Sequence, residues 1–271
     1  MSAPMTLGFL GTGRMAVALA RGCLRGGMIE VSHLIGSDCS EAARANFVRE
    51  TGGRAAACNR DLVEAANVVV VAVKPPQVGE VLRQVSGQMS QRHLVVSIAA
   101  GITLARLRDV LPAEVRLVRA MPNTPALVGA SATAYAADGS ATDDDRRVVE
   151  ALFASVGLAM EVSEDLLDAV TGLSGSGPAY GYRMIEALSD GGVAAGLPRD
   201  TAIRLAAQTL LGAARMVLET GLHPAVLKDQ VTSPGGTTIE GLHELEKAAV
   251  PAALISAVRA AARRARELAE G

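Results

Sequence analysis

Lysine is scarce in this 271-residue sequence, which has only Lys74, Lys228 and Lys247, so any mechanism that needs a lysine has three candidates. Charge of one sign is not in excess either, and the net charge of −2 gives no general attraction to nucleic acid or anionic lipid. We therefore expect no nucleic-acid partner and no membrane partner. Hydrophobic residues make up 49% and charged residues 20% of the chain, which indicates a globular protein.

Cysteine and histidine are also few, and neither is arranged to bind a metal. The three cysteines are odd in number and lack metal-ligand spacing, and the four histidines form no HxxxH pair. The longest wholly apolar run, 68–73, is about a strand long and far too short to span a membrane. The first residues lack the basic start and unbroken apolar core of a signal peptide. These absences predict a reduced, cytoplasmic protein without a metal.

The two halves of the sequence follow different patterns. Up to about residue 160, short apolar runs alternate with amphipathic stretches, which predicts a mostly parallel sheet with helices on both faces. The predicted strands are 5–10, 31–37, 68–73, 94–98, 115–120 and 130–135, and the predicted helices between them are 14–26, 40–51 and 76–89.

After about residue 162 the strand signals stop, and glycine or proline separates one helical pattern from the next. The predicted helices there are 178–195, 199–220, 224–231, 238–249 and 251–270. The sequence therefore predicts an α/β domain at 1–162 and an all-α domain at 163–271.

A glycine-rich motif lies between the first apolar run and the first helical pattern. The stretch Gly11-Thr12-Gly13-Arg14-Met15-Ala16 reads G-x-G-x-x-A. The first glycine permits a tight turn, and the second lets backbone N–H groups approach a pyrophosphate at the start of a helix. The motif predicts a dinucleotide site. Its predicted contacts are Leu10, Gly11, Thr12, Gly13, Arg14 and Met15.

An acidic residue follows the second predicted strand. Asp38 lies where a carboxylate would accept hydrogen bonds from an adenine ribose, and it would repel the 2′-phosphate of NADP. Four neighbouring side chains can donate hydrogen bonds to such a phosphate: Arg14, Ser37, Ser40 and Asn59. The alternative is that Asp38 is a turn residue or a helix cap before Glu41. NADP(H) and NAD(H) both remain possible cofactors.

Two later strand ends are expected to contact the same cofactor, because ligands bind at the carboxyl ends of strands in such sheets. One is Ala72-Val73-Lys74-Pro75, where Lys74 is either a cofactor contact or a solvated surface lysine. The other is Ala99-Ala100-Gly101, whose small residues let a ring or ribose lie against the backbone.

Three further stretches carry a family resemblance: MPNTP at 121–125, DAVTGLSGSGPAY at 168–180 and LKDQVTSPGGTTIEGLHELE at 227–246. Together they closely resemble pyrroline-5-carboxylate reductase, over nearly the whole chain. The resemblance implies a Rossmann-like N-terminal domain and a helical C-terminal domain that forms an intertwined homodimer, often assembled into a decamer. It also implies reduction of pyrroline-5-carboxylate to proline by NADPH or NADH, the last step of proline biosynthesis.

The resemblance also implies a substrate site around the corner SPGGTT at 233–238. Thr238 matches the threonine that hydrogen-bonds the ring nitrogen, Ser233 would touch the substrate carboxylate, and Glu164 matches a residue near the substrate. Gly235 and Gly236 lack Cβ atoms, so their backbone N–H groups can close around a carboxylate. Taken alone, Glu164 would be a solvated acid at the start of a helix, and both hydroxyls would be ordinary turn residues.

Two neighbours of this corner have separate interpretations. Thr237, within the same substrate-binding corner, forms a T-x-x-E pattern with Glu240, which predicts a capping box with Thr237 as the N-cap. Gln230 stands where some relatives carry asparagine; it keeps the amide and is expected to contact the cofactor. Asp38 likewise stands where many relatives carry serine or a basic residue, which bears on the cofactor preference.

Two rival functions are less compatible with the sequence. A β-hydroxyacid dehydrogenase would need a catalytic lysine in the first long C-terminal helix, and 178–195 contains none. A non-enzymatic redox sensor would keep Gly11 and Gly13 without needing the corner at 233–238. The stretch 202–218 is apolar on more than one face, which predicts a dimer through the C-terminal helices.

Overall fold

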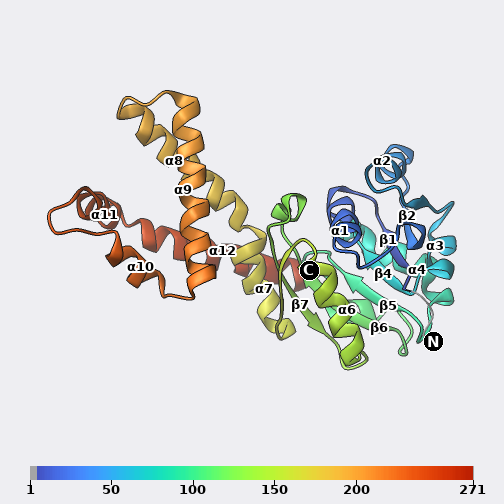
Figure 1. Ribbon diagram of the computed structural model, residues 1–271. Helices are drawn as coiled ribbons and strands as arrows, with labels where there is room; N and C mark the ends of the chain where they lie inside the picture. The colour runs from blue at the N-terminus through green and yellow to red at the C-terminus, as the bar shows by residue number, and fades with distance from the viewer. Residues whose placement is uncertain (1–4, 271) are drawn as a thin grey trace. The chain divides into compact units, whose positions relative to one another are not determined.

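The computed structural model describes residues 5–270, and these fall into two compact units (Figure 1). The first unit comprises the chain up to Ser176 together with the segment that begins at Ala260, and the second is Gly177–Arg259. The division comes later than the boundary predicted near residue 163. The reason is that the segment after 163 packs on the sheet: Leu167 is fully buried beside Ala134 and Ala136.

The first unit is built on one eight-stranded sheet in the described part of the chain, with the order β3-β2-β1-β4-β5-β6-β7-β8. Its strands are β1 (Leu7–Leu10), β2 (Leu34–Ser37), β3 (Arg54–Ala55), β4 (Val68–Val71), β5 (Leu94–Ser97), β6 (Arg116–Met121), β7 (Ser131–Ala137) and β8 (Gly157–Glu161). All neighbours are parallel except β6 and β7. This confirms the predicted mostly parallel sheet and its Rossmann-like order. The order reverses between β1 and β4, where such sheets bind ligands.

Helices cover both faces of the sheet, as predicted (Figure 1). They are α1 (Arg14–Arg25), α2 (Glu41–Thr51), α3 (Asn59–Ala65), α4 (Pro75–Val85), α5 (Leu104–Arg108), α6 (Asp143–Ala154) and α7 (Leu167–Val170). Successive strand residues alternate between two cores. Phe9 and Val70 belong to the core under α1 and α6, whereas Leu10 and Val71 belong to the core under α3 and α4. Burial on both faces explains why β4 is an unbroken run of valine.

Two strands and three α-helices of this unit were not predicted: β3, β8, α3, α5 and α6. Strand β3 is two residues long, and β8 lies at the edge of the sheet with Leu158 and Met160 about half exposed. Neither has the unbroken apolar run of a buried strand. Helix α6 begins with three aspartates, and its capping box joins Thr142 and Asp145.

The second unit is helical, as predicted. It contains α8 (Gly177–Ala194), α9 (Arg199–Thr220), α10 (Pro224–Gln230), α11 (Thr237–Lys247) and the first part of α12 (Val250–Glu270). Helices α8 and α9 form an antiparallel pair that approaches closely at Gly192, where a Cβ would lie 3.2 Å from that of Ala202. Each predicted helix matches an observed one to within about two residues, the usual uncertainty of helix ends.

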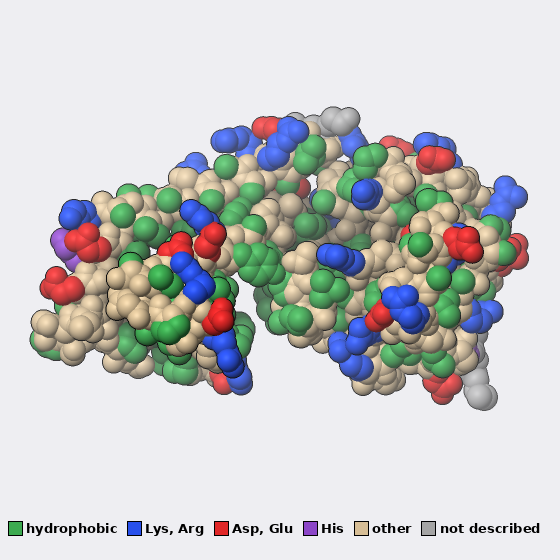
Figure 2. Space-filling view, turned by 90° about the horizontal axis from the view of Figure 1, so that it is seen from above, with side chains coloured by type: hydrophobic (Ala, Val, Ile, Leu, Met, Phe, Trp, Pro, Cys, Tyr) green, Lys and Arg blue, Asp and Glu red, His purple; other side chains and the backbone are tan. Residues whose placement is uncertain are grey.

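This helical unit has almost no interior of its own. Within 177–259 only Ser189, Ala202 and Ala206 are buried. Large apolar side chains lie on its surface instead (Figure 2). They are Tyr182, Leu188, Leu197, Ile203, Leu205, Leu211, Met216, Leu218, Leu222, Val226, Val231, Ile239, Leu245 and Ile255. Exposed apolar surfaces of this extent commonly mark places where proteins make contacts with partners.

Candidate active site

The glycine motif lies where three strand ends meet. The Gly11 N–H donates to Ser37 O (2.8 Å), and the Ala72 N–H donates to Leu10 O (2.7 Å), so the ends of β1, β2 and β4 are joined. Gly11 has a φ of +94°, and a Cβ there would lie 2.8 Å from the Ala72 carbonyl carbon. Only glycine satisfies both constraints. The motif therefore forms the tight turn that the sequence predicts.

Helix α1 begins immediately after this turn and leaves its amino end open. Gly13 is its N-cap, is exposed, and has no side chain to cap the first N–H groups. A Cβ on Gly13 would meet no atom of the described chain within 4 Å. Arg14 is also exposed, and its guanidinium has no hydrogen-bond or ion-pair partner within 5–270. Open N–H groups at a helix start are suited to binding a pyrophosphate.

Gly13→Ala should separate cofactor binding from folding. The added methyl group meets no protein atom, so the melting temperature should stay within about 3 °C of wild type. If the pyrophosphate lies against this backbone, the same methyl group should raise the Kd for NADPH and NADH by about tenfold or more. Fluorescence titration of the cofactor and a thermal melt measure the two effects. An unchanged Kd would contradict a cofactor at this helix start.

Asp38 is bound to the glycine turn. Its Oδ2 accepts from the Thr12 N–H (2.8 Å) and its Oδ1 from the Ser40 N–H (2.9 Å). Burial alone would raise the pKa of Asp38, but the hydrogen bonds from Ser40 and Thr12 outweigh it and lower the pKa below its usual value. The helix-cap alternative is wrong, because Ser40 caps α2 by accepting from Ala43. The contacts are those of a turn residue: Oδ2 also accepts from Thr12 Oγ1 (3.3 Å), and Oδ1 also accepts a long contact from Cys39 Sγ (3.7 Å).

The donors expected to offset Asp38 are partly occupied. Ser37 is buried and gives its hydroxyl proton to Asn59 Oδ1 (2.8 Å). The Asn59 Nδ2 donates in turn to Gln84 Oε1 (2.9 Å). Ser37 therefore has no second proton for a phosphate. Arg14 remains the unoccupied cation nearest in sequence to the turn.

The two later strand ends differ in exposure. Lys74 is exposed at the N-cap of α4, and Pro75 is the first residue of that helix, a favoured place for proline. After β5, Ala99 and Gly101 are buried, and Ala100 is exposed. Gly101 has a φ of +73°, so it forms a left-handed turn. Val73 and Met15, from the predicted contacts, are half-buried.

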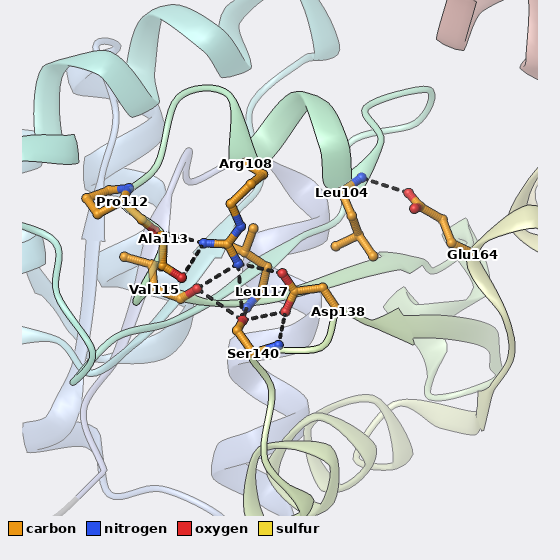
Figure 3. A network of polar contacts seen from close by, with 9 residues as sticks. All are labelled: Leu104, Arg108, Pro112, Ala113, Val115, Leu117, Asp138, Ser140 and Glu164. Atoms are coloured by element: carbon orange, nitrogen blue, oxygen red, sulfur yellow. Dashed lines mark hydrogen bonds and ion pairs between the residues drawn. The ribbon is translucent and has the colours of Figure 1, made fainter.

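Glu164 begins a short 3-10 helix, Glu164–Leu166, but its side chain is not simply solvated. Its Oε1 accepts from the Leu104 N–H (2.7 Å), the contact drawn in Figure 3, and from Arg119 Nη1 (3.2 Å). Arg119 is only 5% exposed and also pairs with Asp168 (3.5 Å). Sequence reasoning missed Arg119 and Asp168, since nothing local marks Arg119 as the partner of Glu164, 45 residues away, or of Asp168.

The corner at 233–238 lies in the second unit, between α10 and α11. Gly235 has a φ of +64°, and the Gly236 N–H donates to Ser233 O (3.0 Å). A Cβ on Gly236 would lie 2.2 Å from Ser233 Oγ, so the serine hydroxyl fills the space beside this glycine.

The capping box predicted for Thr237 is wrong. The N-cap of α11 is Gly236, in extended conformation, and no side chain caps the helix. Thr237 and Thr238 are thus the first two helical residues, with Thr237 exposed and Thr238 half-buried. Because glycine holds the cap position, the first N–H groups of α11 have no side-chain acceptor.

Gln230 ends α10 and is exposed beside Met216 and Leu227. It belongs to the second unit together with Ser233 and Thr238, whereas the glycine turn and Glu164 belong to the first. The structure therefore divides the predicted site residues between two compact units. Within 5–270 no group of three or more His, Cys, Asp or Glu side chains could hold a metal ion. No helix in that range is both long and apolar enough to cross a membrane.

Comparison with known proteins identifies the family. Residues 164–268 match the sequence model described as "Pyrroline-5-carboxylate reductase dimerisation", and 6–101 match "NADP oxidoreductase coenzyme F420-dependent". The pyrroline-5-carboxylate reductase of Pisum sativum is 48% identical over 268 residues, which cover 99% of this chain and 97% of the pea protein. The chain belongs to the pyrroline-5-carboxylate reductase family. It is an oxidoreductase, as the resemblance implied.

Solved structures of the same family have the same fold. The enzyme of Coxiella burnetii is 36% identical with a TM-score of 0.92, covering 98% of this chain and 99% of that one. A Plasmodium falciparum pyrroline carboxylate reductase, solved with NADP bound, is 33% identical with a TM-score of 0.87, covering 98% of each chain. The Rossmann-like domain and the helical dimerisation domain are thus confirmed. The dimerisation match begins at residue 164, close to the boundary predicted from the sequence.

Proposed function

We propose that this enzyme reduces pyrroline-5-carboxylate to proline with two binding regions, described separately: the first part is the glycine turn with its neighbouring strand ends, and the second part is the corner at 233–238. The first part binds the nicotinamide cofactor and the second binds the substrate. The observation that carries the proposal is the uncapped start of α11 behind Ser233, within a family whose members have this activity.

The residues of the first part fit a dinucleotide. The positive φ of Gly11, the open space beside Gly13 and the open N–H groups of α1 form a cradle for a pyrophosphate. In the Ala99–Gly101 turn the exposed small residue is Ala100, which permits a flat group to lie against the backbone. When bound, the nicotinamide supplies a hydride. The protein's task is to hold the two reactants in register and to exclude water.

The second part fits the substrate, a five-membered cyclic imine that carries a carboxylate. The uncapped N–H groups of α11 and the Ser233 hydroxyl offer hydrogen bonds to the carboxylate. Thr238 has a hydroxyl that can accept the N–H of a protonated imine. A protonated C=N carbon is already electrophilic, so it needs no separate acid at the moment of reduction. The nitrogen keeps its proton and becomes the amine of proline.

Steady-state oxidation of NADPH or NADH with pyrroline-5-carboxylate tests the proposal, with proline identified as the product. Turnover that requires the cyclic imine supports it. Turnover with a β-hydroxyacid instead, or cofactor binding without turnover of either substrate, would favour one of the two rival functions. Proline inhibition and reduction of the six-membered homologue can be measured in the same assay.

Both cofactors are expected to work, and Asp38 is expected to favour NADH. Asp38→Ser should shift the ratio of kcat/KM values toward NADPH by roughly tenfold, on the order of 1.4 kcal/mol of removed repulsion. Exposure of the site to water and salt keeps the repulsion modest. The measurement is kcat/KM for both cofactors, in wild type and variant, at one ionic strength. A constant ratio would mean that Asp38 serves the Thr12 turn alone.

The enzyme is proposed to be an obligate homodimer through the helical unit, with a decamer as a further assembly. The exposed apolar side chains on α8 to α11 support this, because no interior of the described unit buries them. Light scattering should give at least twice the chain mass of 27.8 kDa at micromolar concentration. Leu218→Glu, on the most exposed large apolar residue of α9, should weaken the assembly and the activity together. A stable, active species of 27.8 kDa would refute the dimer.

The proposed location is the cytoplasm, without a metal. Cys23, Cys39 and Cys58 are all free thiols, and two of them are exposed. Unpaired exposed thiols are typical of a reducing compartment. Activity should accordingly be unaffected by a chelator such as EDTA.

A further inference from the structure

Helix α5 is short, and polar side chains hold it at both ends (Figure 3). At its carboxyl end Arg108 donates to Pro112 O (2.7 Å) and to Val115 O (2.9 Å), and it pairs with Asp138. At its amino end the Leu104 N–H donates to Glu164 Oε1 (2.7 Å). A five-residue helix is marginal alone, so these anchors determine where it lies.

The anchor at Leu104 is tied to the centre of the sheet. Arg119 lies on β6 directly opposite Ser97 of β5 and is almost fully buried. Its guanidinium reaches Glu164 (3.2 Å) and Asp168 (3.5 Å). The charge on Glu164 is thus compensated on one side by Arg119, and the same carboxylate oxygen accepts the backbone N–H of α5. Hydrogen bonds to charged groups are stronger than neutral ones.

The loop just before α5, 98–103, is held at its start by the Ile98 N–H, which donates to Val71 O (3.1 Å), but its central turn has only longer hydrogen bonds. The Ala99 N–H reaches Ser97 Oγ at 3.4 Å, and the Ile102 N–H reaches Ala99 O at 3.4 Å, both near the limit of a hydrogen bond. At the end of the loop Thr103 Oγ1 caps α5 by accepting from the Arg106 N–H (3.2 Å), and the shorter, charge-assisted bond at Leu104 follows. A shift of Leu104 would therefore move the Ala99–Gly101 turn, the segment expected to lie against the cofactor.

We propose that Glu164 is a positioning residue, which fixes the Ala99–Gly101 turn for the cofactor through the Leu104 N–H and does not act by touching the substrate. This inference rests on the proposed function of the glycine turn. The link runs from buried Arg119 to Glu164, from Glu164 to Leu104, and from Leu104 to the turn. It predicts that loss of Glu164 weakens cofactor binding even when no substrate is present.

The experiment compares Glu164→Ala with Glu164→Gln. The alanine variant loses both bonds, so its Kd for NADPH and NADH should rise about tenfold, the equivalent of 1.4 kcal/mol. The glutamine variant keeps an oxygen that can accept the Leu104 N–H, so its Kd should stay within about threefold of wild type. The KM for pyrroline-5-carboxylate at saturating cofactor should be nearly unchanged in both variants. Cofactor titration without substrate gives the decisive readout.

Asp145 provides a matched control. Its carboxylate also accepts from an arginine of β6, Arg116 (2.6 Å), and from a backbone N–H at a helix start, Thr142 (2.8 Å). Arg116 pairs with Leu94 at the start of β5, whereas the Ala99–Gly101 turn follows the end of β5. Asp145→Ala should lower the melting temperature at least as much as Glu164→Ala, because Asp145 is more deeply buried, yet leave the cofactor Kd unchanged.

A second pair of variants tests the same bond from its donor side. Leu104→Pro removes the N–H at a helix position that favours proline, whereas Leu104→Ala keeps it. Leu104→Pro should weaken cofactor binding more than Leu104→Ala, and this comparison decides the proposal if Glu164→Ala fails to fold. A raised KM for the imine with an unchanged cofactor Kd would overturn the proposal in favour of substrate contact. Unchanged kinetics throughout would reduce Glu164 to a structural role. Failure of the proposed function would show separately, as wild-type enzyme that does not reduce the imine.

Discussion

Thr238→Ala should lower kcat about 10- to 1000-fold and hardly change the Kd of the cofactor, given the usual worth of one hydrogen bond in a transition state. The Thr238 hydroxyl is the proposed hydrogen-bond partner of the ring nitrogen. Alanine removes this hydroxyl and adds no atoms to the site. Thr238 is the second residue of α11 and is half-buried, so its side chain is restrained by the helix. Stopped-flow or steady-state kinetics with saturating cofactor provide kcat.

Thr238→Ser is the matched variant, because serine keeps the hydroxyl and loses only a methyl group. It should retain activity within about tenfold of wild type. Equal losses in both variants would point to packing of the methyl group rather than to the hydroxyl. Activity of the alanine variant within about twofold of wild type would remove Thr238 from the mechanism.

Gly236→Ala should raise the KM for pyrroline-5-carboxylate by about 10- to 100-fold, one to two lost hydrogen bonds at a charged group. A Cβ at this position would lie 2.2 Å from Ser233 Oγ, so the serine must leave its place. It would also approach the N–H groups at the start of α11. Binding of the substrate carboxylate should therefore weaken, while the cofactor Kd stays constant.

Gly241→Ala, in the same helix, is the control for a glycine substitution. A Cβ there meets no described atom within 4 Å. Alanine is favoured over glycine inside a helix by about 1 kcal/mol, so this variant should melt at a slightly higher temperature. Its KM for the imine should match wild type. A similar KM in both glycine variants would show that the Ser233 position does not matter for substrate binding.

The sequence predicted those parts of the fold whose signals are local. Helix α9 begins after Pro198 and ends before Gly221, and the predicted 199–220 matches it residue for residue. The glycine turn was predicted because a positive φ at Gly11 and an N-cap without a side chain at Gly13 both require or favour glycine, which is visible in the sequence. Edge strands leave a weaker mark, and this is why β8 with its exposed Leu158 was missed.

Contacts between distant segments could not be predicted in the same way. Arg119 and Glu164 meet because β6 and the start of the dimerisation segment pack together. Neither residue type indicates which distant residue it will pair with. The T-x-x-E pattern gave a wrong N-cap at Thr237, because α11 begins one residue earlier than predicted and Gly236 is its N-cap. The role of Thr238 came from the family resemblance. From the residues alone, Thr238 could not be distinguished from an ordinary turn residue.

The position of the last helix in the sequence affects the order in which parts of the first unit are translated. Residues of α12 from Ala260 onward belong to the same compact unit as β1, and near their end the backbone at Leu268 lies 3.6 Å from a Cβ built on Gly101. A ribosome must therefore translate all of Gly177–Arg259 before it releases the segment that completes the nucleotide-binding unit. Domains usually fold in turn as they emerge. The cores of the first unit contain no residue of this segment, so the nascent unit can pack its cores early, while the Gly101 turn lacks its neighbour at Leu268 until translation is nearly over.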